Sequence, residues 1–239
     1  SGSLRVAPNL RFAEGMAMES FVQDRLGLPV VTENDATCAC WAEWVMGAGS
    51  PYRDLIMVTL GTGIGGGIVS AGRLMRGSNG FAGEYGHMIV NPDGPQCSCG
   101  RRGCWERYAS GSGLGYLGRE AAIAGGAESV LARAGGLEQI RGEHVSAAAA
   151  DDDADAIRIV GDFAYWVALG LANLVQMLDP AAIVVGGGLV SMGEILFEPV
   201  RAELGHMLGH RRGDGVPVLA AALGERAGAM GAALLAKKV

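Results

Sequence analysis

Clusters of positive charge and long apolar runs are both scarce in this sequence of 239 residues, and each shortage excludes a class of function. Its 19 basic residues stand against 25 acidic ones, giving a net charge of −6, and no Lys/Arg run or basic stripe stands out. We therefore expect no nucleic-acid partner within these residues. No apolar stretch approaches the length that spans a bilayer, and no secretory apolar region is present. We expect a cytoplasmic protein without a membrane partner.

Cysteine is also scarce, with five residues, but three of them fall within eight positions. In a cytosolic chain such clustering favours a metal site over disulfides. His87 precedes them in the pattern H-x9-C-x-C-x4-C, so the candidate ligands are His87, Cys97, Cys99 and Cys104. One histidine and three cysteines supply the four ligands of a structural zinc ion and leave no open position for water. The alternative is a group of unligated buried thiols beside an unrelated histidine.

Glycine, by contrast, is abundant: 40 of 239 residues, about 17% against a typical ~7%. Two glycine runs follow predicted strands. The first, Gly61–Gly67, offers backbone N–H groups and the Thr62 hydroxyl to a phosphate. It is neither a Walker A loop nor a Rossmann fingerprint, because no lysine follows and a strand comes next. The second run is Gly186–Gly188. The alternatives are a tight hairpin and a plain strand-to-helix turn, but two such loops fit a nucleotide lying between them.

Apolar periodicity predicts an α/β protein without internal repeats. The predicted strands are 29–32, 54–60, 67–71, 181–185 and 216–221, with 67–71 the return strand of a hairpin. The predicted helices are 16–26, 36–46, 152–178, 195–208 and 227–238, with a helical region at 112–149 and an irregular one at 77–110. In the helix 36–46 we expect Trp41 and Val45 to face inward and Cys38 and Cys40 to fill core.

Acidic side chains lie beside these features. Asp35 follows a predicted strand, where it could act as the base that phosphoryl transfer to a hydroxyl requires. From this feature alone, an N-cap of the next helix is the favoured interpretation. Glu84 and Glu106 flank the metal motif, and carboxylates can accept hydrogen bonds from the vicinal hydroxyls of a sugar. A metal held by His87 and Cys104 would fix the backbone that carries both glutamates. The alternative is that both are solvated surface charges.

Five motifs occur in order along the chain: Glu33-Asn34-Asp35-Ala36, Leu60-Gly61-Thr62-Gly63-Ile64-Gly65-Gly66-Gly67, Gly83-Glu84-Tyr85-Gly86-His87, Cys97-Ser98-Cys99-Gly100-Arg101-Arg102-Gly103-Cys104-Trp105-Glu106 and Tyr108-Ala109-Ser110-Gly111. Together they resemble the ROK (repressor, open reading frame, kinase) family, and most closely its actinobacterial-type glucokinases. The resemblance implies an actin-like, ribonuclease H-like α/β fold in which a small and a large domain close over a cleft. The small domain, incomplete here, would comprise residues 1–39 and a final helix at about 228–239. The large domain would comprise residues 40–227, with the zinc motif and the nucleotide loops.

The resemblance also implies roles for individual residues. Asp35 would be the catalytic base for the sugar 6-hydroxyl. His87 would bind zinc through one ring nitrogen and the sugar through the other. The implied hexose-binding residues are Asn34, Asp35, Glu84, His87 and Glu106. The implied ATP-binding residues are Gly61, Thr62, Gly63 and Gly65 at the phosphates and Gly186, Gly187 and Gly188 at the adenosine. Mg²⁺ would accompany ATP.

Two departures from the family pattern matter. The chain reads Thr37-Cys38-Ala39-Cys40 where the family has Asn-Ala. Family members also begin with an Asp-x-Gly-Gly-Thr turn that orients Mg-ATP; it is not in this sequence, which starts within the small domain, as Val6-Ala7-Pro8-Asn9 indicates. We therefore expect a glucokinase that does not turn over as these residues alone.

Other functions remain open at this point. The alternatives are an N-acetylmannosamine or other hexose kinase, a sugar-sensing ROK transcriptional regulator, and a shortened, inactive sugar-binding paralogue. We also expect a homo-oligomer, either a dimer or a tetramer.

Overall fold

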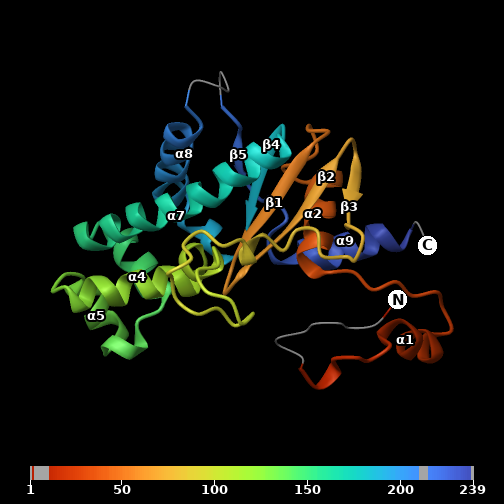
Figure 1. The fold of residues 1–239 in the computed structure, drawn as a ribbon, viewed down its shortest axis with the longest axis horizontal. Helices are drawn as coiled ribbons and strands as arrows, with labels where there is room; N and C mark the ends of the chain where they lie inside the picture. The colour runs from red at the N-terminus through yellow and green to blue at the C-terminus, as the bar shows by residue number, and fades with distance from the viewer. Residues whose placement is uncertain (1, 3–10, 210–214, 238–239) are drawn as a thin grey trace.

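The computed structural model describes residues 2, 11–209 and 215–237. Within them a five-stranded sheet has the order β3-β2-β1-β4-β5 (Figure 1). Strand β1 pairs antiparallel with β2 and parallel with β4. The strands are β1 (Leu55–Leu60), β2 (Ile64–Ser70), β3 (Arg73–Met75), β4 (Ala182–Gly186) and β5 (Val218–Ala220). The predicted hairpin and the strands at 54–60, 181–185 and 216–221 are confirmed, and β2 begins three residues earlier than predicted.

Helices surround this sheet and most of the predicted ones are confirmed. The α-helices are α1 (Met18–Leu26), α2 (Asp35–Met46), α3 (Glu106–Ala109), α4 (Gly111–Ile123), α5 (Glu128–Ala134), α6 (Gly142–Ala150), α7 (Ala154–Leu178), α8 (Glu194–Leu208) and α9 (Ala227–Ala236). The 3-10 helices are η1 (Arg11–Ala13), η2 (Tyr85–His87), η3 (Leu137–Gln139), η4 (Gly188–Met192) and η6 (Gly224–Arg226). Two parts of the sequence analysis lie outside the described residues: Val6-Ala7-Pro8-Asn9, which indicated the small domain, and Lys238, the last residue of the predicted final helix.

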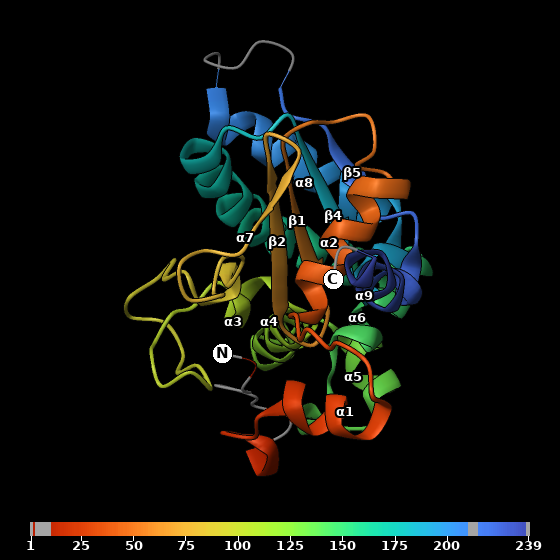
Figure 2. The ribbon, with the colours of Figure 1, turned by 90° about the vertical axis from the view of Figure 1, so that its right-hand side faces the viewer.

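Strand β1 is covered on both faces, as its continuous apolar sequence predicts. Ile56, Val58 and Leu60 belong to one core cluster, with helices α7 and α8. Leu55 and Met57 belong to a second cluster, with α2 and α9. The two helix pairs lie on opposite sides of the sheet in both views (Figures 1 and 2). Alternate side chains of one strand thus anchor both helical layers, because successive residues of a strand point to opposite faces.

Helix α7 is the long central helix, with 25 residues. Its length and composition alone would let it cross a membrane, but 61% of its apolar window is buried inside the protein. The expectation that no apolar stretch has this length is therefore wrong for α7. Its buried face includes Phe163, Val167 and Leu171, which belong to the main core cluster. It is a core helix by its packing.

Helices α2 and α9 pack in close contact. A Cβ atom at Gly231 would overlap the backbone of Cys38, so only glycine permits this approach. Cys38 and Cys40 are buried, which confirms them as core residues, and Trp41 is buried too. Val45 is 39% exposed, so its predicted inward orientation is wrong. The reason is that the buried residues of α2 end at Glu43, and the last turn extends beyond its packing partners.

The segment before α2 differs from prediction. Gly27 ends α1 in the left-handed conformation, and none of the residues of α1 is buried. In both views α1 lies away from the sheet (Figures 1 and 2). The predicted strand at 29–32 is wrong, because these residues form no strand. The backbone N–H and hydroxyl of Thr32 both donate to the carboxylate of Glu19, at 2.9 and 3.1 Å, where a strand would need a neighbouring backbone.

Candidate functional site

A cleft of about 530 Å³ opens at the carboxyl ends of the parallel strands β1 and β4. Ligands bind at such edges in open α/β sheets. Helix α2, the β1–β2 turn, helix α3 and the segment leading into α9 all contribute to its walls. The predicted site residues that line it are Asp35, Gly63, Gly65, Glu106, Gly186 and Gly187. The fold therefore brings together the predicted base, one predicted sugar ligand and parts of both glycine loops.

Asp35 is the first residue of α2, and the cap of that helix is its neighbour. The Asn34 side chain accepts the backbone N–H of Thr37 at 3.0 Å, which is N-cap geometry. Asp35 is exposed to the cleft and accepts the N–H of Ala36 at 2.8 Å. The N-cap interpretation of Asp35 is thus wrong.

The first glycine loop uses some of its N–H groups internally. The N–H of Ile64 donates to Glu106, and that of Gly65 donates to the hydroxyl of Thr59 at 3.1 Å. Along the same turn, the N–H of Gly61 donates to the carbonyl of Gly63 at 3.0 Å. Within the described chain the N–H groups of Thr62 and Gly63 have no such partner. These two N–H groups are therefore the ones that this turn could offer to a phosphate.

The two glycine loops also border a second cavity, of about 720 Å³, on the other side of the β1–β2 turn. Gly61, Thr62 and Gly188 line this cavity and not the first one. Gly187, between them, has φ +88, and a Cβ there would press on the backbone of Leu60. The glycine is thus required by both its conformation and its close approach to β1. A nucleotide extending over this turn would contact both cavities.

The four predicted metal ligands come together, although His87 and Cys104 are 17 positions apart in the sequence. The ligand atoms of His87, Cys97, Cys99 and Cys104 all lie within 4.8 Å of one another. The sulfur atoms of Cys99 and Cys104 are 3.5 Å apart, and Cys97 Sγ lies 3.8 Å from His87 Nδ1. Four ligands around one zinc ion at ordinary bond lengths would be spaced about 3.3–3.8 Å apart. This donor set and spacing could hold a tetrahedral metal.

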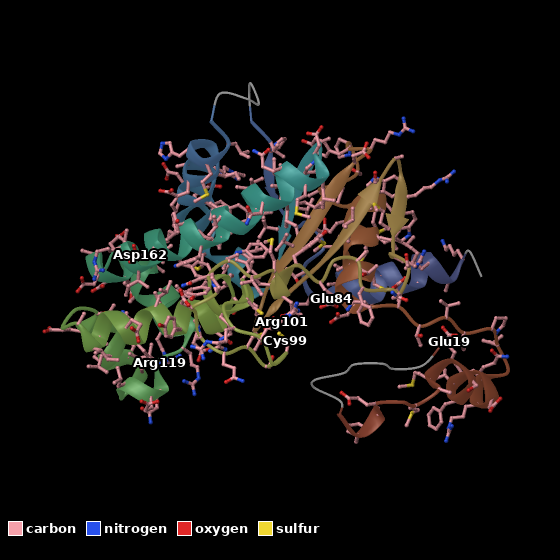
Figure 3. The ribbon with its side chains drawn as sticks, viewed as in Figure 1. Glu19, Glu84, Cys99, Arg101, Arg119 and Asp162 are labelled. Carbon is pink, nitrogen blue, oxygen red and sulfur yellow. The ribbon has the colours of Figure 1, made fainter. Side chains whose placement is uncertain are left out.

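The local backbone and charges suit metal binding. Gly103 has φ +66, and a Cβ there would overlap Asn91, so the turn between the last two cysteines requires glycine. Burial acts to raise the pKa of Cys99, but hydrogen bonds from Arg101 and the neighbouring thiols outweigh it and lower that pKa from 9.0 to about 6. Arg101 and Cys99 are labelled together near the centre of Figure 3. Burial, foremost, and hydrogen bonds with the other two thiols raise the pKa of Cys104 to about 12, so Cys99 is the thiol of this pair that first gives the thiolate that binds metal.

His87 presents its two ring nitrogens to different partners. Nδ1 faces the sulfur of Cys97, while Nε2 lies 4.0 Å from the carboxylate of Glu84. Glu84 does not line the cleft, and its side chain is 47% exposed. Glu84 is labelled in Figure 3 above the metal cluster. His87 thus belongs to the cluster through one ring nitrogen and directs the other toward Glu84, away from the thiols. Of Glu84, His87 and Glu106, only Glu106 lines the cleft.

Trp105 holds the segment that carries the candidate metal ligands on the core. It is fully buried, and its Nε1 donates to the carbonyl of Trp166 on α7 at 2.7 Å. A Cβ at Gly170, one turn further along α7, would overlap the Trp105 ring. Since Trp105 lies between Cys104 and Glu106, its position sets theirs. Two polar side chains that line the cleft escaped sequence analysis: Thr59 and Glu225. Thr59 could have been found as the hydroxyl in an otherwise apolar strand, whereas nothing marked Glu225.

Several known proteins resemble this chain in sequence and in fold. The model of the ROK family matches residues 1–239. The glucokinase of Streptomyces coelicolor is 42% identical over 236 residues, which cover 97% of this chain and 74% of that protein. A crystal structure of a ROK family glucokinase from Streptomyces griseus, in complex with glucose and AMPPNP, superimposes with a TM-score of 0.89 at 41% identity, covering 99% of this chain and 77% of the other.

Relatives with other activities are also similar to this chain. The N-acetylmannosamine kinase of Citrobacter koseri is 39% identical over 217 residues, covering 90% of this chain and 68% of that protein. The xylose repressor of Bacillus subtilis is 29% identical over 214 residues, covering 90% of this chain and 52% of that protein. The expected fold, that of the actin-like, ribonuclease H-like sugar kinases, is confirmed by the structural match.

Proposed function

The chain belongs to the ROK family, and from this premise we propose that it forms the greater part of an ATP-dependent hexose kinase acting on the 6-hydroxyl of glucose. The observation that carries the proposal is the shared cleft. Asp35, Glu106 and both glycine loops line one space of about 530 Å³. A carboxylate base, a carboxylate that can accept sugar hydroxyls and backbone donors for a phosphate are the groups that phosphoryl transfer to a sugar requires.

In the proposed reaction Asp35 orients the 6-hydroxyl and takes its proton as the hydroxyl oxygen bonds to the γ-phosphorus. The bond from that phosphorus to the bridging oxygen breaks, and ADP leaves. Mg²⁺ bound with ATP supplies positive charge at the phosphates. The N–H groups of Thr62 and Gly63, which have no partner among the described residues, would bind phosphate oxygens. The second cavity, which Gly188 borders, would take the adenosine.

The hexose would be held by side chains on two sides of the cleft. Glu106 lines it, and Glu84 and the Nε2 atom of His87 lie at the adjacent metal cluster. Asn34 would contribute through its amide nitrogen, since its oxygen already caps α2. Zinc at the four ligands would act structurally, by fixing the backbone that carries Glu84 and Glu106. It has no open coordination position with which to activate water.

Substitution of Asp35 tests the proposal. Asp35→Asn keeps the shape of the side chain but removes the base, so turnover in an active preparation should fall by about 10³-fold or more. Glucose affinity, measured by calorimetry, should stay within about threefold. Asp162→Asn, on the exposed side of α7, is the matched control and should change neither value. Full activity of Asp35→Asn would disprove the role of Asp35.

The sugar and the class of protein need separate tests. The similarity to an N-acetylmannosamine kinase makes that sugar the first competitor in a coupled assay against glucose. Preferred phosphorylation of N-acetylmannosamine would move the proposal to that kinase. Hexose binding without any turnover by the chain completed with the family's Asp-x-Gly-Gly-Thr segment would favour the regulator or the inactive paralogue. We also propose that the protein is cytoplasmic and forms a dimer or a tetramer, and light scattering tests the oligomeric state. Within each chain, the small domain (residues 1–39 and 228–239) would move against the large domain (residues 40–227).

A further inference from the structure

Glu43 is a buried carboxylate outside the cleft. It lies on α2 and is 0% exposed, among the largest fully buried side chains of the described residues. The ion pairs found in the described part of the chain do not include it. A buried carboxylate without a cation is costly, so hydrogen bonds must compensate for its lost hydration.

Its two oxygens bind two different loops. Oε2 accepts the N–H of Ala48, in the turn after α2, at 2.9 Å. Oε1 accepts the N–H of Leu223, 180 positions later in the sequence, at 2.7 Å. An ionised carboxylate accepts at both oxygens, whereas a glutamine would direct its own N–H₂ group at one of these two donors. Glutamate is therefore the residue that can hold both loops.

The backbone around Glu43 is shaped to admit it. A Cβ at Gly47 would overlap its carboxylate, and the N–H groups of Gly47 and Gly49 both donate to its main-chain carbonyl, at 3.1 and 3.0 Å. The carboxylate thus fills a place that Gly47 leaves open. Such a fit indicates a defined attachment point and not a side chain that happens to be covered.

The loop that Leu223 anchors lines the catalytic cleft. Ala221, Gly224 and Glu225 contribute to its wall, while Asp35 contributes from the first residue of α2. Glu43, two turns further along the same helix, therefore joins the element that carries the proposed base to the loop that carries Glu225. The chain would also pass between the two proposed domains at these places: inside α2, near residues 39–40, and just after the loop, near residues 227–228.

We propose that Glu43 is a positioning residue that fixes the loop 221–226 to helix α2 and so sets the position of Glu225 relative to Asp35 in the cleft. It touches no substrate. Its effect on turnover rests on the proposed function, but the attachment itself does not.

Hydrogen exchange tests the attachment without any assay of activity. In the unmodified protein the Leu223 amide should exchange slowly, although it lies outside helices and strands, because it is bonded to a buried acceptor. Glu43→Gln should speed exchange by about tenfold or more in peptides covering 221–226 and leave α7 unchanged. Glu198→Gln, the same change at an exposed position of α8, is the control. Equal exchange in all three proteins, or faster exchange throughout Glu43→Gln, would overturn the proposal.

Kinetics then connect the attachment to the site. In a completed chain that phosphorylates glucose, Glu43→Gln should lower kcat about tenfold and leave the KM for glucose within about twofold. The reason is that misplaced reacting groups lower the rate of the chemical step more than they weaken glucose binding. Unchanged kcat would overturn the positioning role. If the chain completed with the family's Asp-x-Gly-Gly-Thr segment phosphorylates no hexose, the proposed function fails, while the exchange result on the present residues still decides the attachment. If Glu43→Gln does not fold, rapid exchange of Leu223 in the unmodified protein overturns the proposal.

Discussion

The carboxylate of Glu106 accepts the backbone N–H of Ile64 at 2.9 Å, across 42 positions of sequence. The other oxygen of Glu106 lies 4.0 Å from the thiol of Cys97. One side chain therefore contacts both the glycine turn, where we propose that a phosphate binds, and the segment that carries the candidate metal ligands. A Cβ at Gly63 would overlap this carboxylate, so the turn is shaped around it.

Removing the charge of Glu106 should weaken hexose binding. Glu106→Gln can keep a hydrogen bond from Ile64 but loses one acceptor and the negative charge. We expect glucose affinity to fall by about ten- to a hundredfold, because hydrogen bonds to charged groups contribute about 1.5–3 kcal/mol each. Calorimetric titration measures it, with Glu120→Gln on the exposed face of α4 as the control. Equal affinity in both variants would show that Glu106 serves only the turn.

The metal site should hold one zinc ion per chain. Metal analysis of protein purified without chelator should give about one equivalent, and His87→Ala or Cys97→Ser should reduce it to well under half. A chelator should lower Tm, since the ligands tie an otherwise irregular segment together. Cys38→Ala removes a buried thiol outside the cluster and should keep the full equivalent. A metal-free protein with unchanged Tm would contradict the assignment.

The contact between Gly170 and Trp105 should be intolerant of a single methyl group. Gly170→Ala places a Cβ against the indole ring, and we expect a loss of about 1–3 kcal/mol in the free energy of unfolding. Gly161→Ala is on the same helix with open space at its Cβ, so it should stabilise by about 0.5–1 kcal/mol. Chemical denaturation measures both. Opposite signs for the two variants are the expected result, and a stabilised Gly170→Ala would exclude close packing there.

Asp155 should make stability depend on pH in acid. The N–H of Ala127, foremost, and the guanidinium of Arg158 hold the pKa of Asp155 below its ordinary 3.8. A lowered folded-state pKa stabilises the protein above the ordinary value, and this contribution disappears as pH falls through the folded-state pKa. The difference in unfolding free energy between the parent protein and Asp155→Asn should thus be constant near pH 6 and shrink below about pH 4. A difference that grows in acid would contradict the sign.

Several elements could be predicted because their signals are local. The apolar run of β1 and the period of α7 each require burial wherever the chain folds, and the structure buries both. The predicted strand at 29–32 failed because a strand needs a partner, and Thr32 instead bonds to Glu19. The sequence named Asp35 as either a cap or a base. The capping bond of Asn34 excludes the cap, and the role of base is the one that we propose.

The sequence by itself determined the chemistry available to this protein: its spacing of histidine and cysteines, its two glycine loops and its acidic side chains were legible without coordinates. Only the tertiary structure decided which of them share a cleft. Glu106 meets Ile64, and Glu43 meets Leu223, across 42 and 180 positions of chain. Contacts of this kind carry no local signal, because they form only when the helical layers close on both faces of the sheet and bring distant backbone donors to these carboxylates.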